Sequence, residues 1–219
     1  VVEELMHCLP ATIYLAVASL LFMLVVSLPL GIYSAVRRNS CFDYFVRGLT
    51  FFGVSVPNFW MGLMLLWIFG LQLGWLPIVG GRVSLETIIL PAVTLGIAMA
   101  AKYTRQVRAT VLEELHQDYV VGARARGMSE SYILWQEVML PLMTLLGLSL
   151  GSLLGGAAVI EIVFQWPGLG RLAVEAITYR DFQLVQGVVL WIALMYMVIN
   201  LLVDISYNYF DPRLRKAGK

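Results

Sequence analysis

The sequence predicts an all-α membrane protein that crosses the bilayer several times. Of its 219 residues, 60% are hydrophobic and 13% are charged, which is about half the charged fraction of a soluble domain. The mean hydropathy is +0.81. No segment keeps the alternation of apolar and polar residues that barrel strands require. These observations favour apolar helices as the membrane-spanning elements.

Five runs of the sequence lack Asp, Glu, Lys and Arg: Leu5–Val36, Gly48–Gly81, Thr87–Ala101, Val138–Ile160 and Phe182–Val203. A helix needs about 20 residues to cross about 30 Å of hydrocarbon, and four of the runs reach that length. The third run is shorter. It can still cross if Lys102 and Arg105 extend to the interface or face a protein interior. We therefore predict a polytopic protein with five transmembrane helices in one domain, residues 1–219.

Prolines mark interruptions within these runs. Pro10 is predicted to lie in the first turn of the first span, where its missing N–H costs nothing. Pro29 is predicted to kink the same span near its inner end. Pro57 breaks the second run. We therefore expect Asp43–Ser55 to be a separate interfacial or entering helix and Phe59–Leu73 to be the main crossing.

The basic residues predict the orientation of the chain. Twelve of the fifteen fall in loops on one side, and three fall on the other. The twelve are Arg37, Arg38, Arg47, Lys102, Arg105, Arg108, Arg124, Arg126, Arg213, Arg215, Lys216 and Lys219, and the three are Arg82, Arg171 and Arg180. The richer side should be cytoplasmic, which places the first residue outside and the C-terminus inside. Because no signal sequence precedes the first span, we expect the full gene product to carry a further N-terminal span.

A polar and basic loop, residues 116–132, separates the third and fourth spans. Val120–Gly127 is predicted to form a short helix that ends at Gly127, because glycine readily adopts the positive φ of a helix end. Ser129 is a candidate N-cap for a following helix. Small residues permit close approach of another protein, and arginines bind acidic groups. Alternatively, Arg124 and Arg126 only enforce the membrane topology.

This loop resembles the cytoplasmic loop by which permease subunits of ABC importers dock onto their ATPases. The family signature has a Glu-Ala-Ala triplet, a glycine four residues after its last alanine, and a later Ile-x-Leu-Pro. Val121, Gly122 and Ala123 occupy the triplet, Gly127 is the glycine, and Val138–Pro141 matches the end. The triplet therefore lacks its Glu. The stretch from the glycine to the final proline is also about one helical turn shorter than in peptide importers.

Further segments resemble the dipeptide, oligopeptide and nickel permeases of this class. They are Leu9–Thr12, Ser55–Trp60, Leu73–Pro77, Ile88–Ala92, Glu161–Gly170, Val203–Asp204 and Asp211–Arg215. The resemblance covers nearly the whole chain. It matches the first of the two permeases in such systems, without that permease's first helix and external segment.

The resemblance implies a permease subunit of an ATP-driven importer in a bacterial-type cytoplasmic (inner) membrane. It would carry nickel, free or chelated, or di- or oligopeptides, with a slight preference for nickel. The implied partners are a second permease, two ATP-binding subunits, an extracytoplasmic solute-binding protein and the lipid bilayer, with no nucleic acid. The implied ATPase-coupling residues are Tyr119, Val120, Gly122, Ala123, Arg124, Ala125, Arg126 and Gly127.

The sequence holds no G-x-x-x-x-G-K-[ST] motif, which is the usual cradle for the phosphates of ATP. We therefore expect no cofactor in this chain and no enzymatic activity of its own. ATP and Mg²⁺ would bind to a partner ATPase.

Small and polar residues of the fourth span are candidates for the translocation pathway. Gly151 and Gly155 lie four residues apart, which lets another helix approach closely, although such a face can also pack statically. Glu161 follows the span at its outer end, where a carboxylate reaches the interface at little cost, and the resemblance implies a role in an external gate. The predicted pathway residues are Pro57, Asn58, Ser149, Gly151, Ser152, Gly155 and Glu161. The turn Trp166–Gly170 is predicted to be an outer plug, a contact for a binding protein, or an inert interfacial loop.

Three alternatives are weaker. Gly147–Gly151 fits the G-x-S-x-G nucleophile pattern, but His7 and His116 are predicted to lie at opposite membrane faces, which disfavours an intramembrane serine hydrolase. A secondary transporter needs paired intramembrane acids, and only Glu137 and Glu161, both near span ends, are available. Pairs of methionines could bind a soft metal, but methionine is also a common packing residue. We predict no metal site.

Overall fold

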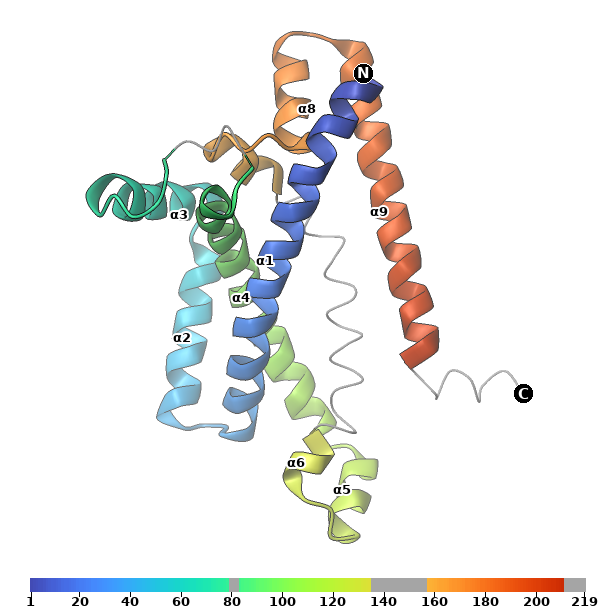
Figure 1. Ribbon diagram of the computed structural model, residues 1–219. Helices are drawn as coiled ribbons and strands as arrows, with labels where there is room; N and C mark the ends of the chain where they lie inside the picture. Colours follow the sequence, from blue (N-terminus) through green and yellow to red (C-terminus); the bar gives the residue numbers. More distant parts are fainter. Residues whose placement is uncertain (79–82, 135–156, 211–219) are drawn as a thin grey trace.

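Helices make up the regular structure of the described part of the chain. The computed structural model describes residues 1–78, 83–134 and 157–210. The helices are α1 (Val2–Val36), α2 (Cys41–Ser55), α3 (Asn58–Leu65), the π-helix η1 (Leu66–Gln72), α4 (Leu85–Glu114), α5 (Asp118–Ala125), α6 (Glu130–Ile133), α8 (Leu169–Thr178) and α9 (Phe182–Phe210). Residues 157–163 are also helical. Figure 1 shows their arrangement.

Three of these helices are long and apolar enough to cross a membrane on their own: α1, α4 and, over residues Phe182–Leu201, α9. A fourth candidate is a bent pair, because α2 and the α3–η1 segment pass the same test only together, at an angle of 100°, as a broken span or a re-entrant loop. Most of the fourth predicted span, Val138–Ile160, lies outside the described residues. The prediction of an all-α, polytopic membrane protein is therefore confirmed.

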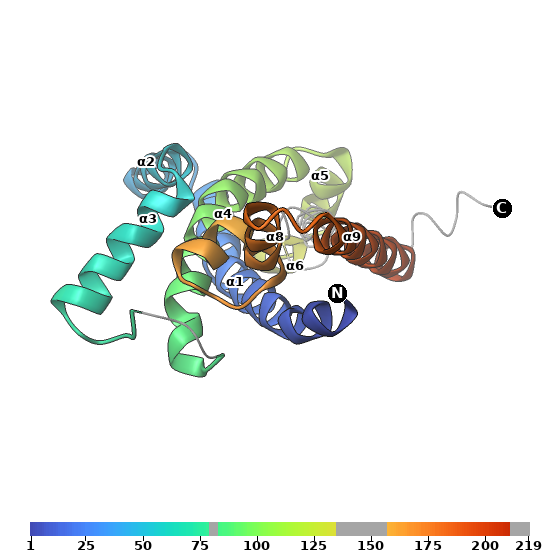
Figure 2. The same cartoon turned by 90° about the horizontal axis from the view of Figure 1, so that it is seen from above.

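The segment divides at Pro57 as predicted, but α2, and not α3, lies along the bundle. Helix α2 runs alongside α1 and α4, whereas α3 turns away from them (Figure 1). Seen from above in Figure 2, α2 is viewed end-on and α3 lies in the plane of the view. Pro57 stands at the break in an extended conformation, with φ −61° and ψ 136°. Apolar composition located the break correctly, but it could not tell which half follows the bundle axis.

The prolines of α1 lie inside a helix that continues past both of them. The helix begins at Val2, so Pro10 stands about two turns further in than predicted. Residues 2–9, of which only the first three precede the charge-free run, account for the difference. Glu3 and Glu4 occupy the first turn, where carboxylates interact favourably with the helix dipole.

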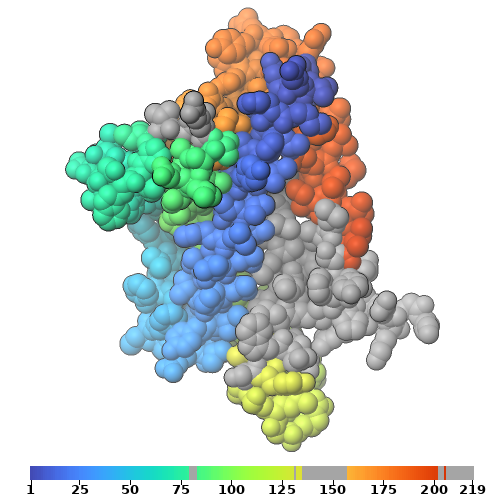
Figure 3. All heavy atoms as spheres, in the orientation of Figure 1, coloured from blue at the N-terminus to red at the C-terminus, as the bar shows by residue number. Residues whose placement is uncertain are grey.

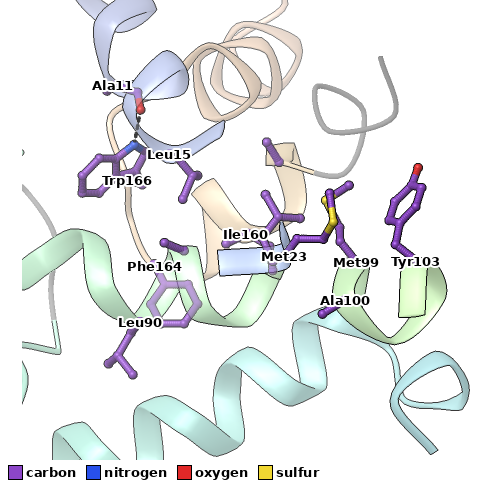
Figure 4. Packing of buried hydrophobic residues seen from close by; sticks show 13 residues of the cluster. Ala11, Leu15, Met23, Leu90, Met99, Ala100, Tyr103, Ile160, Phe164 and Trp166 are labelled. Atoms are coloured by element: carbon purple, nitrogen blue, oxygen red, sulfur yellow. Dashed lines mark hydrogen bonds between the residues drawn. The ribbon is translucent and has the colours of Figure 1, made fainter. Parts of the chain in front are cut away.

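Helices α1 and α4 run in the same direction and pack closely at two glycines. Gly31 of α1 lies against Thr104 and Val107, and Gly96 of α4 lies against Phe22. The main core surrounds this contact and also receives residues from the end of the fourth predicted span and from the segment that follows it. Its buried members include Ala11, Leu15, Met23, Leu90, Leu95, Met99, Ile160, Phe164 and Trp166 (Figure 4).

The contact at Gly31 predicts a large penalty for the smallest possible side chain. A Cβ there would lie 2.6 Å from Val107 Cγ1 and 2.9 Å from the carbonyl oxygen of Thr104. Gly31→Ala should therefore lower the free energy of unfolding by about 1–3 kcal/mol, measured by denaturant titration in detergent micelles. Gly48→Ala is the matched control, because a Cβ there meets nothing within 4 Å. It should be neutral or stabilising by up to ~1 kcal/mol. Equal destabilisation by the two variants would contradict the close contact.

The two ends of the bundle differ in character. The connection between α1 and α2 lies at the same end as α5 and α6, and the N-terminus and α8 lie at the opposite end (Figure 1). In Figure 3, α5 and α6 project beyond α1 and α2. Arg37 and Arg38 belong to the first connection, and Arg124 and Arg126 belong to α5 and its C-cap. Basic residues that the sequence assigns to one membrane side therefore do share one end of the molecule.

Candidate functional site

The projecting loop has a small hydrophobic core of its own. Val120, Ala123 and Ile133 are completely buried. Partly buried side chains surround them: Leu115, Tyr119 and Met128. Because α5 and α6 bury apolar surface against each other, the loop is a folded unit and not an extended connection. We call residues 115–133 the coupling unit, after the role that the family resemblance implies for them.

Gly127 ends α5 in the way the sequence predicts. Its φ is +79°, which a residue with a Cβ adopts only with strain. The N–H of Gly127 donates to the carbonyl of Arg124 at 2.9 Å, and the N–H of Met128 donates to the carbonyl of Ala123 at 3.2 Å. This pair of bonds is a Schellman motif, and Met128 and Ala123 belong to the same small core, as the motif favours. Ser129 then caps α6, since its Oγ accepts from the N–H of Tyr132 at 3.3 Å.

Polar contacts tie the coupling unit together. Arg124 forms a two-pronged ion pair with Glu130, at 2.7 and 3.1 Å, and this hydrogen bonding lowers the pKa of Glu130. The hydroxyl of Tyr119 donates to the carboxylate of Glu114, at the end of α4. Arg124, which was predicted to bind acidic groups of another protein, therefore has an acidic partner within its own loop.

The outer face of α5 carries the residues that remain accessible. Val121 is 55% exposed, Ala125 and Arg126 are exposed, and Gly122 is half-buried. A Cβ at Gly122 would meet nothing within 4 Å. Val120 and Ala123, predicted as coupling residues, point instead into the small core. Val121 is absent from the predicted coupling residues. An amphipathic helix that buries Val120 and Ala123 places Val121 on its exposed side, which could have indicated its accessibility.

A buried ion pair joins three helices near the same end of the bundle. Asp43 of α2 is completely buried. Its carboxylate accepts two hydrogen bonds from Arg108 of α4, at 2.6 and 2.8 Å. It also accepts from Ser34 of α1 at 2.6 Å and from the N–H of Asn39 at 3.0 Å. Arg108, which the sequence places among the twelve basic residues of one membrane side, is therefore a structural partner of Asp43.

A second buried carboxylate organises the opposite end. Glu161 is completely buried. Its Oε1 accepts from the Thr12 hydroxyl at 2.8 Å, and its Oε2 accepts from the N–H groups of Gly170 and Arg171 at 2.7 and 3.1 Å. The oxygen of Thr12 in turn accepts from the N–H of Leu169 at 2.8 Å. The side chain of Glu161 is therefore enclosed by these donors and does not extend to the surface, and its role in an external gate stays a prediction.

The turn that follows Glu161 is held against α1. Trp166 is completely buried, and its indole N–H donates to the carbonyl of Ala11 at 2.9 Å (Figure 4). Gly168 leaves room for the carboxylate, since a Cβ there would lie 2.2 Å from Glu161 Oε1. We call Thr12, Glu161 and residues 166–171 the outer clasp. The side chain of Trp166 is not available to an external partner in this conformation.

The remaining predicted pathway residues divide into two groups. Pro57 is exposed at the α2–α3 break, and Asn58 lines a cleft of ≈ 390 Å³ between this break and α4. The others lie outside the described residues: Ser149, Gly151, Ser152 and Gly155. The G-x-S-x-G pattern lies there too.

Solved structures share this fold. A chain of the inward-facing MetNI methionine ABC transporter superposes with a TM-score of 0.76 at 18% identity, over 95% of this chain and 97% of that chain. A chain of an amino acid ABC transporter crystallised with histidines gives a TM-score of 0.70 at 16% identity, over 95% and 94% of the two chains. The fold is therefore that of a helical membrane subunit of an ABC transporter.

Sequence comparison defines the family. Residues 27–216 match the family described as the binding-protein-dependent transport system inner membrane component. The dipeptide transport system permease protein DppB of Alkalihalophilus pseudofirmus is 35% identical, over 98% of this chain and 74% of that protein. The glutathione transport system permease protein GsiC of Escherichia coli K12 is 38% identical, over 98% and 71%. The chain belongs to this family of ABC importer permease subunits, which confirms the resemblance and leaves the secondary-transporter alternative unsupported.

Proposed function

We propose that this permease carries small peptides across a bacterial-type cytoplasmic membrane. Two relatives that each match 98% of the chain are named for transport of a dipeptide and of glutathione, itself a small peptide. Nickel, which the sequence slightly favoured, has no such support from these relatives. The cleft beside the α2–α3 break also holds two cationic side chains, Lys102 and Arg105, which disfavour a free metal cation.

Transport in this scheme needs partners that supply energy and substrate. The chain would pair with a second permease, and each pair would bind two ATPases that hold ATP and Mg²⁺. An extracytoplasmic solute-binding protein would deliver the peptide. This chain itself would be non-catalytic. The end of the bundle that carries the coupling unit would face the cytoplasm, together with the C-terminus.

We infer that the coupling unit docks onto an ATPase. The observation that carries this inference is a folded unit with its own core, placed beyond the bundle at the basic end (Figure 3). Its accessible face includes Val121, Gly122, Ala125 and Arg126. A half-buried glycine with open space above it permits close approach of a partner's surface. The chain reaches α5 from the end of α4 in three residues, so a displacement of the unit would move α4.

A bulky side chain on this face tests the proposal. Gly122→Trp should leave membrane insertion intact, because the Cβ position is open. It should lower the ATP hydrolysis stimulated by the binding protein at least about tenfold, equivalent to ~1.4 kcal/mol, by blocking the docked state. The measurement uses vesicles that contain the complete transporter.

Gly122→Ala is the matched control, since alanine is the family's residue at this triplet position and its methyl group is small. Stimulated hydrolysis should stay within about twofold of the original, equivalent to ~0.4 kcal/mol. Normal coupling in Gly122→Trp would refute docking through this face.

A further inference from the structure

The cleft beside the α2–α3 break has a mixed lining with a basic side. Its volume is ≈ 390 Å³, within the range of roughly 300–1,000 Å³ that small-molecule sites occupy. Apolar and polar groups of α2, α3 and α4 line it: Gly53, Val54, Asn58, Leu95, Ala98, Met99, Lys102, Tyr103 and Arg105. Two of these nine residues are cationic and none is acidic.

The two cations lie within the depth of the membrane-spanning helices. Gly31 of α1 contacts Thr104 and Val107, so Lys102 and Arg105 stand at the level of residues 28–31 of α1. That level is about 8–12 Å inside the end of α1 at Val36, at 1.5 Å per residue. Cations at such depth are costly, and they mark sites that face water or a polar ligand.

Neither cation is neutralised within the described part of the chain. Lys102 lies 5.4 Å from the ring centre of Tyr103, which attracts it weakly, and both cationic residues are exposed. The four ion pairs of the described residues involve other arginines. Because Lys102 and Arg105 are three residues apart on α4, they share one face of that helix. This face of α4 therefore carries positive charge that an anion can neutralise.

The helix break adds a third positive element. Asn58 is the first residue of α3, and α3 begins without a side-chain cap after Pro57. The first N–H groups of an uncapped helix carry partial positive charge and can bind an anion. Broken membrane helices place such N-termini toward anionic substrate groups. Gly53 and Val54, in the last turn of α2, complete this wall of the cleft.

We propose that this cleft binds the terminal carboxylate of a peptide during its passage through the transporter, with Lys102 and Arg105 as the binding cations. The proposal rests on the proposed function and names the chemical group by which the pathway recognises its substrate. The more exposed apolar groups of the lining, Val54 and Ala98, contact the remainder of the peptide without selecting its side chains.

Thiol protection in the complete transporter tests the cleft directly. Val54→Cys places a thiol on its wall, and a water-soluble maleimide reports its accessibility. Glycyl-phenylalanine should protect this thiol at a concentration at least tenfold lower than its C-terminal amide does, because the amide lacks the negative charge. Native Cys41, exposed at the start of α2 and absent from the lining, serves as the internal reference.

Charge-removal variants assign the effect. Lys102→Gln with Arg105→Gln should abolish the difference between acid and amide. Arg37→Gln with Arg38→Gln removes the same charge from the same end of the bundle, outside the cleft, and should preserve the difference. Equal protection by acid and amide, or none by either, would overturn the proposal. So would a Val54→Cys thiol that never reacts, or protection by phosphatidylglycerol and not by the peptide.

Uptake of glycyl-phenylalanine, measured in the same vesicles with ATP and the binding protein, separates the two proposals. Acid-specific protection without ATP-driven uptake would overturn peptide import as the function and leave the anion site standing. Uptake without acid-specific protection would overturn the anion site and leave peptide import standing.

Discussion

Replacement of Arg108 by methionine should lower the free energy of unfolding by about 3–5 kcal/mol, because it leaves the carboxylate of Asp43 buried without its cationic partner. Asp43 is completely buried, so its carboxylate does not reach water in this structure. Methionine keeps much of the volume of arginine, so the loss reports charge and hydrogen bonding more than packing. Denaturant titration in detergent micelles gives the measurement.

The same carboxylate offers a matched control in Arg47. That arginine approaches Asp43 only to 3.7 Å, and its side chain is 42% exposed. Arg47→Met should therefore cost less than about 1 kcal/mol. Combining Asp43→Leu with Arg108→Met should recover most of the stability, since an apolar pair can replace a buried ion pair. Similar losses in the two single arginine variants would show that the pair does not hold these helices.

Replacement of Glu161 by leucine should lower the free energy of unfolding by about 2–4 kcal/mol. The carboxylate accepts from one hydroxyl and two backbone N–H groups, and leucine leaves two buried donors and the part-buried N–H of Arg171 without an acceptor. Faster proteolysis within residues 164–168, followed by mass spectrometry, should accompany the loss, because the outer clasp fixes this turn against α1.

Glutamine at position 161 provides the conservative comparison. Its amide oxygen can accept from Gly170 and Arg171 while its amide nitrogen donates to the oxygen of Thr12, so the cost should stay within about 1 kcal/mol. Glu175→Leu is the exposed control. Glu175 pairs with Arg171 at 2.6 Å but is 47% exposed, so its loss should cost less than about 1 kcal/mol. A Glu161→Leu protein as stable as Glu175→Leu would contradict the outer clasp.

Local features of the structure were predictable from the sequence. The long apolar helices follow from charge-free runs, because a lipid-exposed backbone must satisfy its hydrogen bonds within the helix. The positive φ of Gly127 and the cap at Ser129 follow from the properties of single residues. The break at Pro57 likewise needs only the geometry of proline. Each depends on neighbours a few positions away.

Features that depend on distant partners were not predictable in this way. Asp43 and Arg108 lie 65 positions apart, and Thr12 and Glu161 lie 149 apart. Charge-free runs cannot show that either carboxylate is buried against such a partner. The direction of α2 along the bundle was not predictable for the same reason, since Asp43 ties α2 to α1 and α4. Burial of Val120 and Ala123 required the core that α6 completes.

The paired glycines of α1 and α4 have a mechanical consequence. Phe22 at Gly96 and Val107 at Gly31 form two contacts, about 14–16 Å apart along the helix pair, that oppose sliding of one helix past the other. Two helices held together at two points resist bending more than either helix does alone. A displacement of the last turn of α4 would therefore be transmitted along α1 to Ala11, about 38 Å from the end of α1 at Val36, and little of it would be lost to bending. A movement at one membrane surface and a movement at the other would then occur together.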